Sequence, residues 1–260
     1  MKNILRSIFR YFNLGIVKYP TIQLMHENIN AKRDLDFLKA IPVENTSQIL
    51  ELLNRSKSQL NQDLFVLSQL NFKENGYFVE FGAADGLLAS NTYLLEKEFG
   101  WAGILAEPAK CWHNKLKENR KADLEFSCVW KNTGSMLNFN EVAIPELSTL
   151  LEFSSNDGHG ATRKKGETYQ VSTISLINLL QKYNAPKVID YLSLDTEGSE
   201  YDILENFDFS SYEFRIITCE HNYTPMRTKI NALLVSKGYK RILSSISQFD
   251  DWYIKESLIP

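Results

Sequence analysis

The sequence of 260 residues suits one large domain with an appendage better than two full domains. Its 43% hydrophobic and 23% charged residues are sufficient for a buried core, which excludes global disorder. Lys+Arg 29 against Asp+Glu 32 gives a net charge of -3, and this balance excludes a general nucleic-acid binder.

Cysteine content and hydropathy indicate where the protein works. The three cysteines Cys111, Cys128 and Cys219 cannot all pair, so a disulfide scaffold is excluded and a reducing compartment is expected. No apolar run approaches the length that spans a membrane, and Arg6 and Arg10 interrupt the apolar residues that a signal peptide needs. We therefore expect a soluble, cytoplasmic protein.

The segment Met1–Pro20 has four basic residues and no acidic one, and its apolar residues recur at helical spacing. A basic amphipathic helix can lie on an anionic membrane surface, which would make the protein peripheral to the membrane. Packing on the main domain or in a dimer interface is the simpler interpretation. A second helical pattern extends from Ile49 to Leu70 and ends at Asn75-Gly76.

After Gly76, short apolar runs alternate with helical stretches. This alternation predicts an α/β fold, a Rossmann-like doubly wound and mostly parallel sheet. The last two strands are too close in sequence for a helical crossover, so they should form an antiparallel hairpin at a sheet edge. The predicted strands are Tyr77–Phe81, Gly103–Glu107, Leu124–Val129, Val188–Leu194, Phe214–Cys219, Tyr239–Leu243 and Trp252–Ile254, and the predicted helices are Asn91–Phe99, Cys111–Arg120, one from Ser199 and Met226–Lys237.

The polar segment Ser154–Gly166 interrupts this alternation. Loops of this length without secondary structure are uncommon in compact domains and often serve as lids or binding loops. A plain disordered insertion is an equally good interpretation, and the cluster Arg163-Lys164-Lys165 is too short to indicate nucleic-acid binding.

The turn after the first strand, Gly82-Ala83-Ala84-Asp85-Gly86, predicts a ligand site, because open α/β sheets bind ligands at the carboxyl ends of their strands. A dinucleotide site would have GxGxxG and no carboxylate facing the pyrophosphate. A carboxylate from Asp85 suits the sulfonium and ammonium of S-adenosylmethionine, and it disfavours an NAD(P)-dependent oxidoreductase.

Glu107-Pro108 ends the second strand, where a carboxylate can accept both hydroxyls of an adenosine ribose. Glu107 fits NAD as well as S-adenosylmethionine, and capping the next helix is its structural alternative. Asp85 is therefore the residue that separates the two cofactors.

Five groups of residues, in order, resemble the FkbM-type S-adenosylmethionine-dependent methyltransferases over roughly residues 58–254. They are Ser58–Asp63, Gly76–Gly86 with Ser90-Asn91-Thr92, Gly100–Pro108, Asp190–Glu200, and Glu220-His221-Asn222 with Asp251-Trp252-Tyr253.

The resemblance implies a class I methyltransferase domain at residues 58–260, after an N-terminal helical extension at residues 1–57. It implies methyl transfer, usually to a hydroxyl of a sugar, surface glycan or secondary metabolite, and the alternative is a non-catalytic binding protein on the same fold. The expected partners are a small-molecule or glycan acceptor and no nucleic acid. The cofactor site that it implies consists of Glu80, Gly82, Ala83, Asp85, Gly86, Asn91, Glu107, Pro108, Cys128 and Asp195.

The catalytic residues should come from the ends of the fourth and fifth strands, which carry Asp195, Glu197 and Glu220-His221-Asn222. His221 is the natural general base, because its ordinary pKa is about 6.5. Asp195 and Glu197 would orient the acceptor or balance the charge of the cofactor. No metal is predicted, although Asp195, Glu220 and His221 have the oxygen and nitrogen atoms that a metal site needs.

Overall fold

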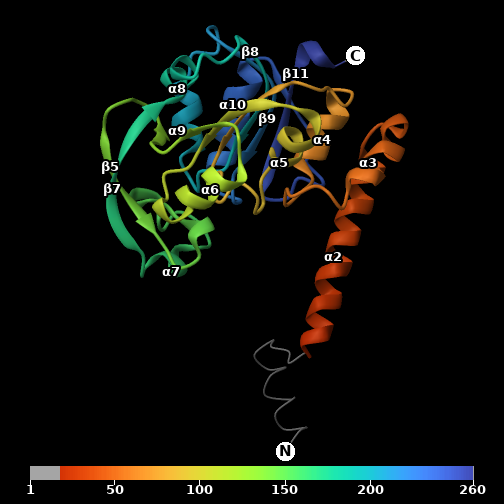
Figure 1. Cartoon of the computed structure of the whole chain (residues 1–260), viewed down its shortest axis with the longest axis horizontal. Helices are drawn as coiled ribbons and strands as arrows, with labels where there is room; N and C mark the ends of the chain where they lie inside the picture. The colour runs from red at the N-terminus through yellow and green to blue at the C-terminus, as the bar shows by residue number, and fades with distance from the viewer. Residues whose placement is uncertain (1–17, 260) are drawn as a thin grey trace, which may run out of the picture.

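The computed structural model describes residues 18–259, and their main feature is a seven-stranded sheet. Its strand order is β10-β11-β9-β8-β1-β2-β3, and every pairing is parallel except the two that β11 makes (Figure 1). The predicted fold, including the antiparallel C-terminal pair, is confirmed. The strands are β1 (Tyr77–Phe81), β2 (Ala102–Ala106), β3 (Asp123–Glu125), β8 (Val188–Leu194), β9 (Glu213–Glu220), β10 (Tyr239–Ile242) and β11 (Asp250–Lys255).

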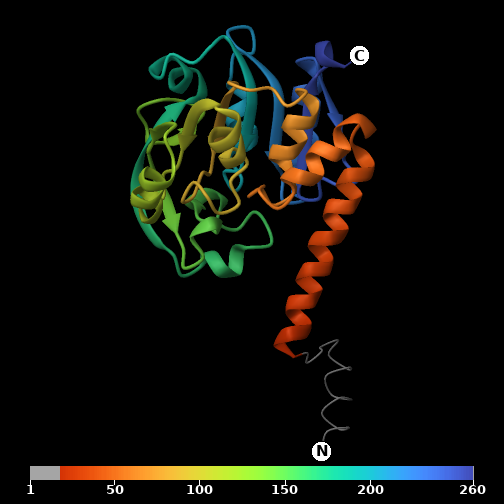
Figure 2. The same ribbon diagram turned by 45° about the vertical axis from the view of Figure 1, so that its right-hand side comes forward.

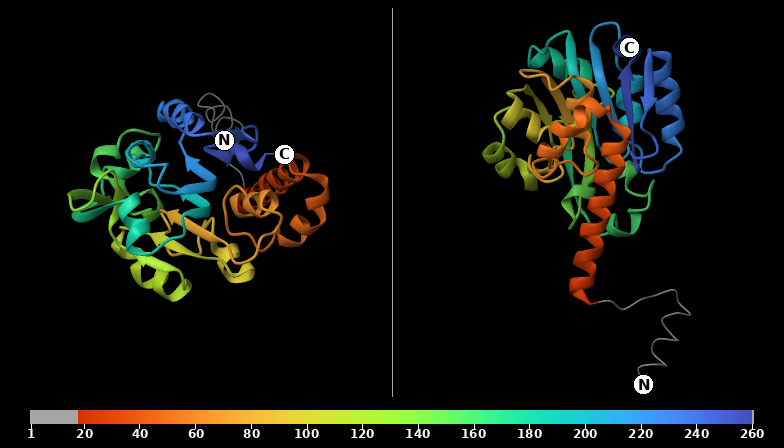
Figure 3. Two further views of the ribbon diagram at one scale, coloured as in Figure 1. Left: turned by 90° about the horizontal axis from the view of Figure 1, so that it is seen from above. Right: turned by 90° about the vertical axis from the view of Figure 1, so that its right-hand side faces the viewer.

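Each face of the sheet packs against helices, as the continuous apolar strands require (Figure 3). One core cluster joins the sheet to α8 (Leu176–Lys182), α9 (Glu200–Glu205) and α10 (Met226–Ser236). The other joins it to α4 (Gln62–Gln69), α5 (Tyr93–Phe99) and α6 (His113–Asn119), which follows the short helix η2 (Lys110–Trp112).

The N-terminal part of the described chain is α2 (Tyr19–Ala40), η1 (Val43–Asn45) and α3 (Thr46–Leu52). Phe37 is buried, and its ring meets the edge of Trp252 at a centroid distance of 6.3 Å. Towards its N-terminus, α2 leaves the domain and extends away from it (Figures 1 and 2). Among the residues that the model describes, no helix is long and apolar enough to cross a membrane. Most of the predicted helix at Met1–Pro20 lies outside the described residues.

The helical pattern from Ile49 to Leu70 is divided between α3 and α4, so the prediction of one continuous helix is wrong. Asn61 has a left-handed backbone with φ 65°, which breaks the helix immediately before α4. Phe37 and Ile49 share one core cluster with Leu64, so no gap in packing marks the predicted boundary after residue 57, which stays a prediction.

A second sheet, of order β4-β7-β5-β6, lies beside the main one and was not predicted (Figure 1). The single predicted strand Leu124–Val129 is wrong, because the chain turns between β3 and β4, where the Ser127 N–H donates to the Glu125 carboxylate. The added elements are β4 (Cys128–Trp130), β5 (Met136–Glu141), η3 (Pro145–Leu147), β6 (Thr149–Leu150), η4 (Leu151–Phe153), α7 (Gly160–Arg163), β7 (Glu167–Ser175) and, at the C-terminus, η5 (Glu256–Leu258).

Candidate active site

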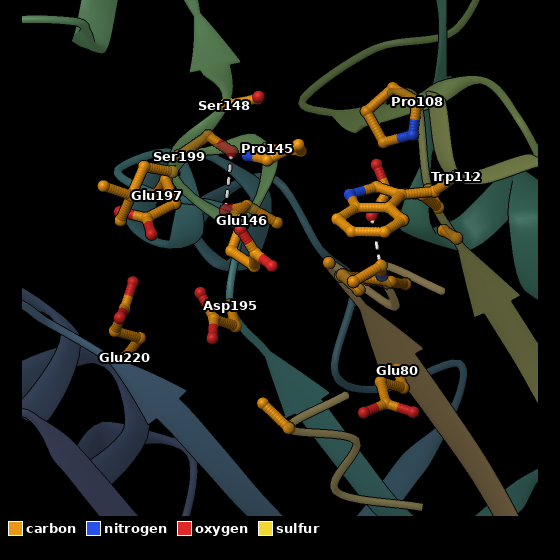
Figure 4. A pocket seen from close by; sticks show the side chains of 18 of the residues that line it. Glu80, Pro108, Trp112, Pro145, Glu146, Ser148, Asp195, Glu197, Ser199 and Glu220 are labelled. Carbon is orange, nitrogen blue, oxygen red and sulfur yellow. Dashed lines mark hydrogen bonds between the residues drawn. The ribbon is translucent and has the colours of Figure 1, made fainter. Parts of the chain in front are cut away.

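A cavity of about 400 Å³ lies at the carboxyl ends of β1, β2, β8 and β9. The strand order reverses between β1 and β8, and open α/β sheets bind ligands at such a switch point. Figure 4 shows Pro108 and Trp112 on one side of the cavity, Glu197 and Glu220 on the other, and Asp195 between them. The volume lies within the range of small-molecule sites.

The glycines of the first turn are required by packing. Gly82 has φ +73°, and a Cβ built on it would lie 1.9 Å from the main-chain oxygen of Asp195. Gly86 has φ +78°, and its Cβ would meet Arg120 and Leu116 at 2.5 and 2.7 Å. Gly82 lines the cavity and Gly86 does not, so only the first of the two predicted cofactor glycines reaches it.

Asp85 and Ala83 do not line the cavity. The Asp85 carboxylate accepts the N–H groups of Leu87 and Leu88 at 2.9 and 2.7 Å, so it stabilises its own turn. The carboxylate that was expected to face the cofactor is therefore directed elsewhere, and the argument that used it against NAD is wrong. Ala84, at φ +46°, reaches the cavity together with Gly82 and was not predicted as a cofactor-binding residue.

Glu80 and Asn91 lie at the cavity's wall near β1. The Glu80 carboxylate accepts the Asn91 N–H at 2.7 Å and the hydroxyls of Ser90 and Thr92, so it mainly holds the loop before α5. Asn91 donates to the Ser193 hydroxyl, and its Oδ1 is buried without a partner in the described structure. That unpartnered acceptor is suited to a ligand's N–H group.

Glu107 is buried in the cavity wall, where its carboxylate accepts the N–H groups of Ala84 and Ala109 at 2.8 and 2.7 Å. Burial raises the pKa of Glu107 to about 7, although the two hydrogen bonds lower it. Pro108 and Cys128 line the same end, as predicted for cofactor-binding residues. Trp112 also lines it and was missed, because η2 is a tighter helix in which side-chain directions differ from those of an α-helix.

Three carboxylates, Asp195, Glu197 and Glu220, gather at the ends of β8 and β9. Each has an oxygen within 4.8 Å of the others, a group that could share protons or surround a cation. Burial raises the pKa of Asp195 to about 6, and a hydrogen bond from Glu220 opposes the rise. Burial and the Asp195 charge raise the pKa of Glu220 well above its ordinary value. The upward shifts of both pKa values favour one proton between Asp195 and Glu220.

Glu197 is the member of this group that has a cationic partner. Its Oε2 accepts from Arg163 Nη2 at 2.7 Å and from Asn222 Nδ2 at 3.1 Å. Burial and the Asp195 charge raise the pKa of Glu197 to about 8, and the Arg163 guanidinium opposes the rise. Glu197 has φ +59°, a strained backbone that such contacts must hold.

His221 is buried but does not line the cavity. Its Nδ1 accepts the Tyr223 N–H at 3.0 Å, and its Nε2 lies 3.8 Å from Asp251 Oδ1 of β11. Burial lowers the pKa of His221. The predicted general base therefore faces away from the cavity, and the residue that joins Asp195 and Glu220 is Glu197 instead of His221.

The segment between β4 and β7 forms a wall that the sequence did not predict. Pro145, Glu146, Leu147 and Ser148 line the cavity, and so does His159 from the predicted lid loop. This contact favours the lid interpretation of Ser154–Gly166 over a plain insertion. Gln59, which belongs to the motif Ser58–Asp63, also lines the cavity and was not predicted as a site residue.

This topology, with a buried acid ending β2 and a cavity at the switch point, defines a class I methyltransferase domain. The family model of the methyltransferase FkbM domain matches residues 80–249, and the chain belongs to this family. Membership confirms the resemblance seen in the sequence, and the cofactor is S-adenosylmethionine. No curated protein matches the chain.

Several solved structures are similar at low identity. A precorrin-6y C5,15-methyltransferase from Geobacter metallireducens is 11% identical, over 75% of this chain and 87% of that one, with a TM-score of 0.41. The human methyltransferase 10 domain containing protein is 11% identical, over 75% and 79%, with a TM-score of 0.39. The N-terminal domain of human METTL16 in complex with SAH is 11% identical, over 75% and 68%, with a TM-score of 0.36.

Proposed function

We propose that the protein transfers the methyl group of S-adenosylmethionine to a hydroxyl of a sugar, surface glycan or secondary metabolite. The observation that supports this best is the group Asp195, Glu197 and Glu220 at one end of the cavity. A hydroxyl must lose its proton when it is methylated, and a carboxylate with a pKa near neutrality is suited to take that proton.

The cavity fits the cofactor on chemical grounds. Bound S-adenosylmethionine supplies a methyl group on a positively charged sulfur, already activated for displacement. Asn91 Oδ1 would accept from its ammonium, since this buried acceptor has no partner among the described residues. Glu107 retains lone pairs for the ribose hydroxyls, and Pro108 and Trp112 would flank the adenine.

Asp195 is the residue that we assign as the base. It lies between the two ends of the cavity (Figure 4), and its pKa of about 6 leaves it ionised at neutral pH. Burial and the Asp195 charge raise the pKa of Glu220, which favours its protonated form beside an ionised Asp195. Glu197 and Asn222 would orient the acceptor hydroxyl beside Asp195.

The charge of the lining favours an acceptor without phosphate. The described residues that line the cavity include no lysine or arginine. Carboxylates at short range repel an anionic acceptor and attract a sulfonium. This supports a neutral hydroxyl compound and disfavours nucleic acid. The acidic residues in the lining are Glu80, Glu107, Glu146, Asp195, Glu197 and Glu220.

The test is transfer of a labelled methyl group to a panel of neutral glycosides, with the matching sugar phosphates in parallel. We expect Asp195→Asn to lower turnover by roughly 10²–10⁴-fold, because a positioned base contributes about that much. We expect His221→Asn, the matched control, to stay near the wild-type rate once its folding is verified. An active Asp195→Asn enzyme would contradict the assignment of Asp195 as the base. Inactivation of the wild type by a chelator would show that the carboxylates bind a metal cation instead of sharing a proton.

The alternative, a non-catalytic protein that binds a partner on this fold, makes a different prediction. Titration calorimetry of the wild type with S-adenosylmethionine would show no binding. Measurable affinity together with transfer to a neutral glycoside would exclude it.

A further inference from the structure

The wall of the cavity opposite the sheet is the cap segment, residues 145–163, which lies between β5 and β7. Its cavity-lining side chains include Glu146, Ser148 and His159. In Figure 4, Pro145, Glu146 and Ser148 lie on the same side as Glu197. The cap segment and the ends of β8 and β9 therefore line the same part of the cavity as Asp195.

Arg163 ends the cap segment and has a fully buried side chain. Its Nε donates to the Leu147 carbonyl at 2.7 Å, and its Nη1 donates to both carboxylate oxygens of Asp157 at 2.8 Å. Its Nη2 donates to Glu197 Oε2 at 2.7 Å. One guanidinium thus joins two points of the cap segment to the carboxylate group of the site.

Weaker contacts support the same attachment. Thr149 Oγ1 donates to the main-chain oxygen of Glu197 at 2.9 Å. Asn140 Nδ2 donates to the Arg163 carbonyl at 2.9 Å and to the Ser154 hydroxyl at 3.0 Å. These contacts fix the two ends of the cap segment, and among them only Arg163 carries a charge to Glu197.

Asp157 pairs with the Arg163 guanidinium within the cap segment, and Glu197 is the second anion, which joins that guanidinium to the end of β8. A buried guanidinium is strongly destabilising when it loses a partner, and so is a buried carboxylate. The planar fork of arginine matches three acceptors in fixed directions, which the single ammonium of lysine cannot do. When the cap segment moves away, Glu197 loses its cation, and when Glu197 moves, the cap segment loses its anchor.

We propose that Arg163 is a positioning residue that couples closure of the cap segment to the placement of Glu197 at the acceptor end. Arg163 does not line the cavity, so it acts through Glu197, Glu146 and Ser148. The inference rests on the proposed function for its catalytic consequence, while the coupling itself is a property of the folded chain.

Hydrogen–deuterium exchange of the full-length protein measures the coupling without an acceptor. We expect Arg163→Lys and Glu197→Gln each to raise exchange of backbone amides in residues 147–163 about tenfold, because each frees the segment to open locally. The double variant should exchange no faster than the single variants, since the two residues act through one bond. Lys164→Gln, an exposed neighbour, is the matched control and should resemble the wild type. Unchanged exchange, or additive effects in the double variant, would overturn the coupling.

A second measurement separates positioning from a merely structural role. With the best glycoside of the panel, Arg163→Lys should raise the acceptor KM and lower kcat, while the affinity for S-adenosylmethionine measured by calorimetry stays unchanged. Loss of cofactor affinity with unchanged acceptor KM would assign Arg163 to cofactor binding instead. If the wild type binds no S-adenosylmethionine, the proposed function fails, and the exchange experiment still decides whether the coupling exists.

Discussion

Gly82 and Asp195 make the closest approach in the site. A Cβ atom built on Gly82 would lie only 1.9 Å from the main-chain oxygen of Asp195, and the Gly82 backbone is left-handed. The glycine therefore allows the backbone of Asp195 to lie against the turn, in addition to leaving space for a ligand. The sequence pattern predicted the turn correctly. It explained the glycine only in part, because the main-chain oxygen of Asp195 belongs to a residue that is more than a hundred positions away in the sequence.

We expect Gly82→Ala to lower both S-adenosylmethionine affinity and turnover, because Asp195 and the turn must separate to admit a methyl group. Gly134→Ala is the matched control, since Gly134 also has a positive φ, of +87°, but nothing lies within 4 Å of its Cβ position. Both variants bear a backbone cost of about 1 kcal/mol from the left-handed conformation. Calorimetry and transfer assays measure S-adenosylmethionine affinity and turnover for both variants. Equal losses in the two variants would show that backbone strain alone accounts for the effect of Gly82→Ala.

His221 shows what a motif cannot determine. The sequence places it directly after a buried strand, beside the site. The chain then turns through Asn222 and Tyr223, whose φ values are 43° and 56°, and the imidazole is directed towards β11. Asn is enriched in the left-handed conformation but Tyr is not, so two consecutive left-handed residues could not be predicted here. The carboxylates were therefore found as a group, and the base within the group was misassigned.

At the scale of elements, predictability follows burial. β1 and β8 have the predicted bounds, because strands buried on both faces are continuous apolar runs. β5 and β7 were missed because their exposed positions carry polar residues and their apolar positions are few. The second sheet that they form provides the cap segment, so the least predictable elements form the acceptor end of the site.

The outer part of α2, a helix whose bounds the sequence did not predict, follows the basic segment whose partner was left open. Tyr19 and Ile29 are 72% and 62% exposed, and Leu24 and Met25 are exposed too. For this part of the helix, packing on the main domain is not observed. The remaining interpretations are a dimer interface and a membrane surface that the basic segment before it would also contact.

We propose the membrane surface, and we expect the protein to co-sediment with vesicles containing phosphatidylserine and not with phosphatidylcholine alone. Salt should release it, because exposed charges are screened within about 8 Å at physiological ionic strength. Deleting residues 1–17 should abolish binding and leave the thermal unfolding of the domain unchanged. Failure to sediment at every salt concentration would favour a dimer, which analytical ultracentrifugation would detect.

At the scale of the whole molecule, buried carboxyl groups outweigh their cationic partners. Burial raises the pKa of Asp250 to about 8 and the pKa of Glu107 to about 7. A carboxyl group whose pKa is raised by folding binds its proton more tightly in the native state. Its contribution to stability is complete below the unfolded pKa of about 4 and is lost as pH rises through the folded value.

Other groups do not reverse this trend between pH 7 and 8. Burial lowers the pKa values of His113 and His221, so both are neutral in the native state above pH 7. The unfolded imidazoles, with a pKa of about 6.5, keep only a minor protonated fraction there, which opposes the trend weakly. Burial raises the pKa of the Cys128 thiol to about 12, so this thiol ionises first in the unfolded state and its contribution to stability also falls as pH rises. The free energy of unfolding of the cofactor-free protein should therefore fall across this interval.

Asp250 allows this to be measured away from the cavity, because it does not line it. Its Oδ2 accepts from Gln62 and Trp252 at 3.1 Å, and an asparagine amide keeps an acceptor there without a charge. Each carboxyl group that is protonated only in the native state changes stability by up to about 1.4 kcal/mol per pH unit. We expect urea unfolding of Asp250→Asn to lose less stability than the wild type between pH 7 and 8. Parallel losses in the two proteins would show that Asp250 is already ionised in the native state, and the protonated pair of Asp195 and Glu220 would then need re-examination by the same method.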